Sequence, residues 1–130
     1  MLGSKEFICK ARRVRKVFGG GMRQAGIIAA GGLFALKNNI ERLKEDHQKA
    51  KIIEAELNQC SWVESVLPVE TNIVVAILKD QSKRDEFIKK LKNKKCLIMA
   101  FGPGMLRMVT HLDISLGDVE EFCSNLKSLN

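Results

Sequence analysis

The sequence predicts a protein of the α/β class, with three helical segments followed by a small α+β sheet that is backed by helices. Two observations lead to this prediction. Up to about residue 57, apolar residues recur at the three- and four-residue spacing of helices. Beyond Pro68, short and continuously apolar β-branched runs alternate with amphipathic ones, as strands and helices of a layered domain do. The expected order of this second part is β-α-β-β-α.

A glycine turn separates the first two helices. The first helix is expected over Glu6–Phe18, and Gly19-Gly20-Gly21 then ends it, because three glycines cost too much backbone entropy inside a helix. The second, from Met22 to about Lys37, is apolar almost all round, which indicates burial.

The third helix is expected after Asn38, which forms a cap together with Glu41 three residues later. Its apolar stripe at helical spacing consists of Ile40, Leu43, His47, Ala50, Ile53 and Leu57. The opposite, charged face carries Arg42, Lys44, Glu45, Lys49 and Glu56. We interpret His47 on this stripe as a packed or half-exposed residue and not as a ligand.

Three strands and two helices are expected after Pro68. The strands are Asn72–Leu78, Cys96–Phe101 and Met105–Leu112, and Gly102-Pro103-Gly104 forms the turn between the last two. Ser82 with Asp85 is expected to cap the intervening helix, and Ser115 with Asp118 to cap the final one.

The positive charge is concentrated at the start of the chain. Of the net charge of +7, residues 1–23 hold seven basic groups and one acid, whereas the rest holds fifteen basic and fourteen acidic groups. Such a local excess is typical of an anion site, an oligomer contact or a nucleic-acid patch. The basic stretch lacks interleaved Tyr or Trp to stack on bases. We therefore expect no nucleic-acid partner.

The cysteine and hydropathy patterns exclude further classes. Cys9, Cys60, Cys96 and Cys123 are spread singly, which favours free thiols in a reducing cytosol over a zinc site or disulfides. The longest apolar stretch, Ala25–Leu36, is shorter than the roughly twenty residues of a bilayer span. No secretory signal pattern is visible. We expect a soluble, cytoplasmic protein without a metal site.

Two groups of residues are candidates for chemistry. In Lys16–Gln24, a glycine turn leads into a helix between Lys16 and Arg23, so backbone N–H groups and a forked guanidinium can meet an anion. The alternative is a plain helix–helix turn with solvated basic residues.

Arg107 interrupts an apolar strand, where a guanidinium needs an anionic partner or a solvent-exposed face. Alternation puts Arg107 on one face with Val109 and His111, and an internal ion pair or a solvent-facing edge remains open.

Five stretches together resemble the low-specificity L-threonine aldolases, which are pyridoxal-phosphate (PLP) enzymes of fold type I. They are Lys10-Ala-Arg-Arg-Val-Arg-Lys16, Gly19-Gly-Gly-Met-Arg-Gln24, Asn38-Asn-Ile-Glu-Arg-Leu-Lys-Glu-Asp-His47, Glu70-Thr-Asn72 and Arg107-Met-Val-Thr-His-Leu-Asp113. They occur in the family's order and span nearly the whole chain.

The resemblance implies cleavage of L-threonine or L-allo-threonine to glycine and acetaldehyde by a PLP-dependent carbon–carbon lyase that is a homo-oligomer, a dimer or tetramer. It implies that Arg107 binds the substrate carboxylate and that Lys16 and Arg23 line the cofactor pocket. It also implies that residues 1–37 end the large PLP domain and that residues 38–130 form the C-terminal small α/β domain. The family's Schiff-base lysine is expected about 25 residues before the glycine turn, so we expect no catalytic lysine within these 130 residues and no activity of this chain alone. A non-catalytic oligomerisation fragment and a basic nucleic-acid-binding module are the alternatives.

Overall fold

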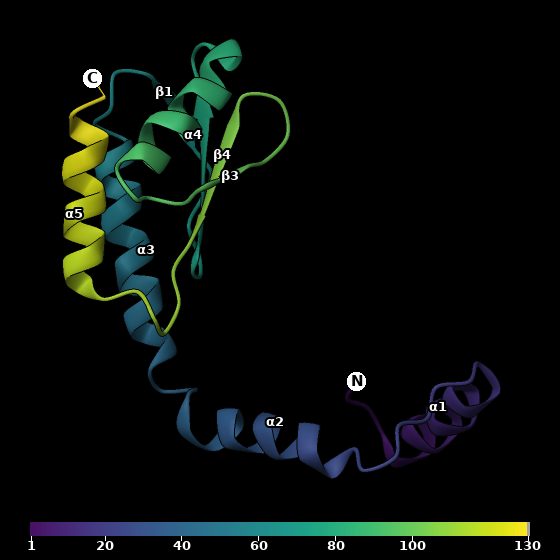
Figure 1. The fold of residues 1–130 in the computed structure, drawn as a ribbon. Coiled ribbons are helices and arrows are strands. Elements are labelled where there is room, and N and C mark those ends of the chain that lie inside the picture. Colours follow the sequence, from purple (N-terminus) through teal and green to yellow (C-terminus); the bar gives the residue numbers. More distant parts are fainter. Residues whose placement is uncertain (130) are drawn as a thin grey trace. The chain divides into compact units, whose positions relative to one another are not determined.

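The computed structural model describes residues 1–129 and divides into two compact units, Met1–Ile40 and the chain from Glu41 onward. The mixed α/β class predicted from the sequence is confirmed. Figure 1 shows the helices of the first unit and the layered arrangement of the second. In the part of the chain that is described, no helix combines the length and apolar character that crossing a membrane requires.

The first unit consists of α1 (Lys5–Val17) and α2 (Gly26–Asn38). Ser4 caps α1 by accepting a hydrogen bond from the backbone N–H of Phe7, at 3.2 Å. The helix ends in a Schellman turn, in which the N–H groups of Gly19 and Gly20 donate to the carbonyls of Lys16 and Arg15. Gly19 has a φ of 75°, the left-handed conformation for which this turn requires glycine.

Helix α2 departs from the sequence prediction in two ways. It begins at Gly26 and not at Met22, because Gln24 adopts a φ of 51° that no helix continues through. None of its residues is buried by the described chain, and Ile27, Phe34 and Leu36 are more than half exposed. The burial expected for this apolar helix is therefore not provided by the described chain itself.

The second unit is a four-stranded antiparallel sheet with helices against one face. The strands are β1 (Val63–Val66), β2 (Ile73–Leu78), β3 (Met99–Ala100) and β4 (Met105–Val109), in the order β1-β2-β4-β3. Helices α3 (Leu43–Leu57) and α5 (Leu116–Lys127) pack side by side, and α4 (Arg84–Asn93) follows a short 3-10 turn, η1 (Gln81–Lys83).

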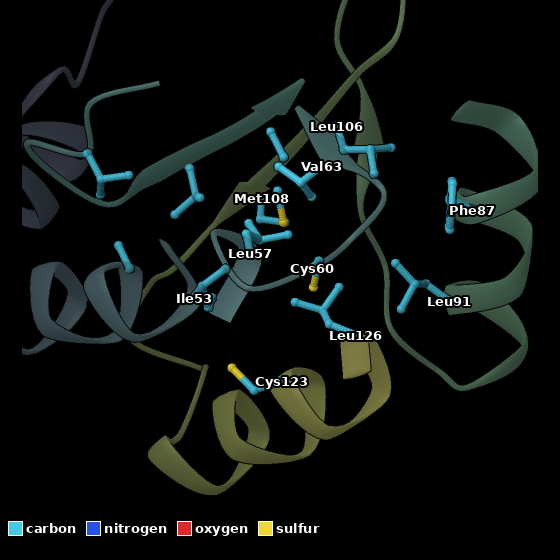
Figure 2. Packing of buried hydrophobic residues seen from close by; sticks show 14 of the residues in the cluster. Ile53, Leu57, Cys60, Val63, Phe87, Leu91, Leu106, Met108, Cys123 and Leu126 are labelled. Carbon is cyan, nitrogen blue, oxygen red and sulfur yellow. The ribbon is translucent and has the colours of Figure 1, made fainter. Parts of the chain in front are cut away.

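The core of this unit lies between the sheet and the three helices (Figure 2). Strands β1, β2 and β4 contribute Val63, Val74, Ala76, Leu78, Leu106 and Met108. The helices and their ends contribute Ala50, Ile53, Leu57, Cys60, Phe87, Leu91, Val119, Cys123 and Leu126. Each of these side chains is at most 7% exposed. Removing these apolar side chains from water is the main stabilisation of the folded second unit.

Two of the three predicted helix caps are wrong. Asn38 lies in the last turn of α2, where its amide donates to the carbonyl of Phe34 at 2.8 Å, and α3 starts only at Leu43. Ser82 does not cap α4, because Asp80 accepts hydrogen bonds from the N–H and hydroxyl of Ser82 and forms the 3-10 turn first. The capping box of Ser115 and Asp118 at α5 is confirmed.

The strand predictions were correct in position but not in extent. The sequence does not predict strand β1. Of the predicted strand Cys96–Phe101, only the two residues of β3 are extended and paired. The reason is that Cys96 still donates its backbone N–H to Leu91 at the end of α4, and Lys95 has a φ of 62°. Strand β4 ends at Val109, so His111 and Leu112 lie beyond it.

Candidate functional site

The sheet face away from the helices is apolar and partly open. Residues paired directly across neighbouring strands point to the same face. Arg107 pairs with Val75 of β2 and with Met99 of β3, which places these three side chains on the face opposite Leu106 and Met108. The same face carries Ile73, Ile77, Met105 and Val109. Ile73 and Val109 are about 40% exposed and Met99 is 63% exposed.

Arg107 is half-buried among these apolar side chains, in the middle of β4. Its guanidinium carbon lies 5.8 Å from the centre of the Phe101 ring, a cation–π contact. Within residues 1–129, no carboxylate forms an ion pair with it and no acceptor takes a hydrogen bond from it. The internal ion pair left open by the sequence is therefore excluded for the described chain. A forked cation on a rigid strand without an anion suits recognition of a carboxylate from outside the chain.

The polar end of β4 is fixed by residues that sequence reasoning did not single out. Thr110, only 1% exposed, donates its hydroxyl to the backbone carbonyl of Asp46 at 2.7 Å. Its backbone N–H donates to the carbonyl of Asn72 at 3.0 Å, and the Asn72 amide donates to the Thr110 carbonyl at 2.7 Å. The sequence feature that could have pointed to this contact is Thr110 itself, a polar residue at a core-facing position of an apolar strand.

Asp46 is itself a buried carboxylate, 3% exposed, in the first turn of α3. It accepts hydrogen bonds from Arg42 at 2.9 Å and from Lys49 at 3.4 Å. Burial raises the pKa of Asp46, but the hydrogen bonds and charges of Arg42 and Lys49 outweigh burial, so its pKa lies below the ordinary value. Lys49, assigned from the sequence to the charged outer face, is only 8% exposed because Asp46 holds it inward.

Lys16 and the glycine turn form one basic site in the first unit. A Cβ atom added at Gly21 would lie 3.8 Å from Lys16 Nζ, so the ammonium group lies against the turn. A Cβ atom at Gly20 would approach Arg15 Cγ to 2.7 Å, which explains why glycine is needed there. Arg23 is exposed in the segment that leads to α2. The structure thus brings Lys16 and the turn together within this unit.

The two histidines lie on different elements, His47 within α3 and His111 after β4. His111 follows the end of β4 and its Nδ1 accepts a hydrogen bond from the backbone N–H of Asp113 at 3.3 Å. His47 is partly exposed on α3, as expected of a packed or half-exposed histidine. No group of three or more His, Cys, Asp and Glu side chains within the described residues is placed to hold a metal ion.

The fold of this chain occurs in larger enzymes. A cystine C-S lyase, solved in complex with its product cysteine persulfide, matches 78% of this chain and 28% of its own with a TM-score of 0.61 at 17% identity. A variant of that lyase with glycine covalently linked to its PLP cofactor matches with a TM-score of 0.60. The mixed α/β fold of this chain therefore also occurs within these enzymes, one of which carries PLP.

The sequence comparisons define the family. Residues 1–81 match the model of the beta-eliminating lyases, and the chain belongs to this family. It is 38% identical over 122 residues to low-specificity L-threonine aldolase 1 of Arabidopsis thaliana, covering 92% of this chain and 34% of the plant protein. It is 34% identical over 128 residues to the low specificity L-threonine aldolase of Escherichia coli K12, covering 98% and 37%. The chain thus spans about a third of the length of these relatives.

Proposed function

We propose that this chain is the C-terminal part of a PLP-dependent threonine aldolase that cleaves L-threonine or L-allo-threonine to glycine and acetaldehyde. The family match and the two aldolase relatives support this proposal. In this assignment residues 1–37 end the large PLP domain, and residues 38–130 are the small domain. The observation that carries the substrate assignment is Arg107, a cation without an anionic partner in the described chain on a partly open apolar face.

The residues present fit the groups that they would hold. An amino acid substrate presents a planar carboxylate, which a guanidinium meets with two parallel hydrogen bonds. Because Arg107 is half-buried among apolar side chains, this attraction is stronger than at a fully solvated site. Lys16 and Arg23 flank a glycine turn and offer positive charge to an anionic cofactor or substrate. When bound, PLP supplies the electron sink for cleavage of the Cα–Cβ bond, and these side chains supply binding and orientation.

The test of Arg107 uses a complete aldolase that carries this sequence as its C-terminal part. Arg107→Lys keeps the charge but loses one of two hydrogen bonds, so we expect PLP content to stay normal while KM for threonine rises. A loss of this kind costs about 2–3 kcal/mol, or roughly 30- to 150-fold in kcat/KM. Arg107→Ala is expected to lower kcat/KM further, because it removes the charge as well as both hydrogen bonds.

The control is Arg84→Lys, because Arg84 donates to Asp85 at 2.8 Å and to the Gly102 carbonyl at 2.7 Å. This variant is expected to lower the melting temperature slightly with unchanged KM. A fully PLP-loaded Arg107→Ala enzyme with unchanged kcat/KM would remove the carboxylate-binding assignment.

A second property is favoured by one observation, the exposure of α2. A helix with Ile27, Phe34 and Leu36 more than half exposed offers an apolar surface that another part of an enzyme or another copy would cover. We propose that the complete cytoplasmic enzyme is a homo-oligomer and that the 130-residue chain self-associates and is inactive alone. Light scattering at two concentrations tests the association, and a concentration-independent monomer would contradict it.

A further inference from the structure

The position of Arg107 depends on how firmly β4 is held, and the two ends of β4 are held differently. Strand β3 pairs with β4 only at Leu106 and Arg107. Beyond Arg107, the β3 side of the strand has no ladder partner among the described residues, whereas β2 continues to pair through Met108 and Val109. The end of β4 is therefore held by β2 on one side only, and an end held on one side opens more easily.

Asn72 and Thr110 close the ladder at this end. Two hydrogen bonds join them. The backbone N–H of Thr110 donates to the backbone carbonyl of Asn72, and the side-chain amide of Asn72 donates to the backbone carbonyl of Thr110. The Thr110 hydroxyl then joins the strand to α3 through the Asp46 carbonyl. Thr110 points into the helix layer and Arg107, three residues earlier, points to the opposite face. The hydrogen bonds of Thr110 on the core side therefore set the position of the β4 backbone, and with it the position of Arg107 on the open face.

We infer that Thr110 and Asn72 are positioning residues for Arg107: by tying the end of β4 to β2 and α3, they hold the guanidinium where a substrate carboxylate accepts two hydrogen bonds from it. This inference rests on the proposed function of Arg107. A forked guanidinium contact is sensitive to small displacements, because a shift that breaks one of its two hydrogen bonds leaves a weaker single contact.

The first test measures the strand itself in the 130-residue chain, by amide hydrogen exchange. Thr110→Val keeps the shape of the side chain and removes only the hydroxyl donor. We expect exchange of the amides at residues 108–110 to rise about tenfold, the effect of one lost buried hydrogen bond, with α5 and β1 unchanged. Thr110→Ser, which keeps the hydroxyl, is expected to restore most of the protection. Thr71→Val is the matched control, since Thr71 is the exposed threonine beside Asn72.

The second test measures coupling to Arg107 in a complete aldolase carrying this sequence. Thr110→Val and Asn72→Ala are each expected to raise KM for threonine about five- to twentyfold with normal PLP content. In the Arg107→Ala background the same changes are expected to lower kcat/KM by less than about twofold, because a positioning residue has no effect once the residue it positions is gone.

The outcomes separate the two proposals. If Arg107→Ala leaves kcat/KM unchanged, the proposed role of Arg107 fails, and hydrogen exchange still decides whether Thr110 fixes β4. Two results would overturn the positioning inference when Arg107→Ala does lower kcat/KM. The first is that Thr110→Val lowers kcat/KM as much in the Arg107→Ala background as in the wild type. The second is that Thr110→Val raises amide hydrogen exchange evenly across the whole second unit. Should Thr110→Val not fold, Asn72→Ala carries the same comparison, because it removes the Asn72 side-chain hydrogen bond to the Thr110 carbonyl.

Discussion

Replacing Asp46 by asparagine tests the buried charge cluster at the start of α3. The side chains of Asp46, Lys49 and Arg42 are 5%, 11% and 18% exposed, so the carboxylate neutralises two cations that are largely removed from water. Removing one partner of such a cluster leaves uncompensated buried charge, which costs about 3–5 kcal/mol in a fully buried pair. Because Arg42 can turn toward solvent, we expect about 2–4 kcal/mol for Asp46→Asn.

The matched control is Glu41→Gln. Glu41 pairs with Lys44 at 3.1 Å with the same three-residue spacing as Asp46 and Lys49, but both side chains are more than three-quarters exposed. An exposed pair of this kind contributes at most about 0.5 kcal/mol. The double replacement of Asp46 by Leu and Lys49 by Met is expected to recover most of the loss, because well-packed apolar groups substitute for a buried ion pair.

The assay is urea unfolding of the 130-residue chain, followed by fluorescence of its single tryptophan. Trp62 stacks on Phe87 with ring centres 4.6 Å apart, so its emission reports the core of the second unit. With a slope of about 1–1.5 kcal/mol per molar urea, the expected loss of about 2–4 kcal/mol lowers the midpoint for Asp46→Asn by about 1.3–4 M. Equal midpoints for Asp46→Asn and Glu41→Gln would refute the reasoning.

The same cluster predicts a pH dependence. The pKa of Asp46 is lower in the folded protein than in the unfolded chain, so its stabilisation is complete above about pH 4 and is lost as the pH falls through the lower, folded-state value. The difference in unfolding free energy between the wild type and Asp46→Asn is therefore expected to shrink as the pH falls below about 4.

Two further predictions use the same unfolding assay or thiol labelling. Gly104 and Gly102 both have φ above 60°, but a Cβ atom at Gly104 would lie 2.4 Å from Gln81 Cγ, and one at Gly102 would meet only Met105 Sδ at 3.8 Å. Gly104→Ala is expected to cost more than the roughly 1 kcal/mol of backbone strain expected for Gly102→Ala, and equal costs would contradict the clash. Burial raises the pKa of the Cys60 thiol to about 11, with the nearby Glu56 carboxylate adding to the effect, whereas Cys9 is exposed. Iodoacetamide at pH 8 is therefore expected to label Cys9 first and Cys60 only on unfolding, as mass spectrometry of the digested chain would show.

Much of the fold follows from local patterns. The capping box at α5 joins residues three apart, so the chain encodes it within one helical turn. The alternation in β4 correctly separated Leu106 and Met108, which face the core, from Arg107 on the other face. The mixed α/β class and the resemblance to threonine aldolases likewise needed only the sequence, because periodicity and motif spacing are properties of the chain itself.

The errors occurred where local signals compete. Asn38 ends α2 and does not start α3, and Asp80 accepts the hydrogen bonds of the turn that precedes α4. The sequence alone does not show which polar side chain bonds to a given backbone group. Strand β1 carries two exposed polar residues, Glu64 and Ser65, and is a strand only because β2 offers a partner. Its existence depends on pairing across the sheet and not on propensity.

By itself, the sequence determined which residues are chemically able to act: a forked cation in an apolar strand, and a basic glycine turn before an apolar helix. Only the tertiary structure decided that Arg107 has no anionic partner within the described residues and that Lys49 turns inward to Asp46. The same holds for the contact between Thr110 and Asp46, which are 64 residues apart. The physical reason is that caps and alternation arise between residues a few positions apart, whereas burial and the choice of a distant hydrogen-bond partner are set when the sheet packs against its helices.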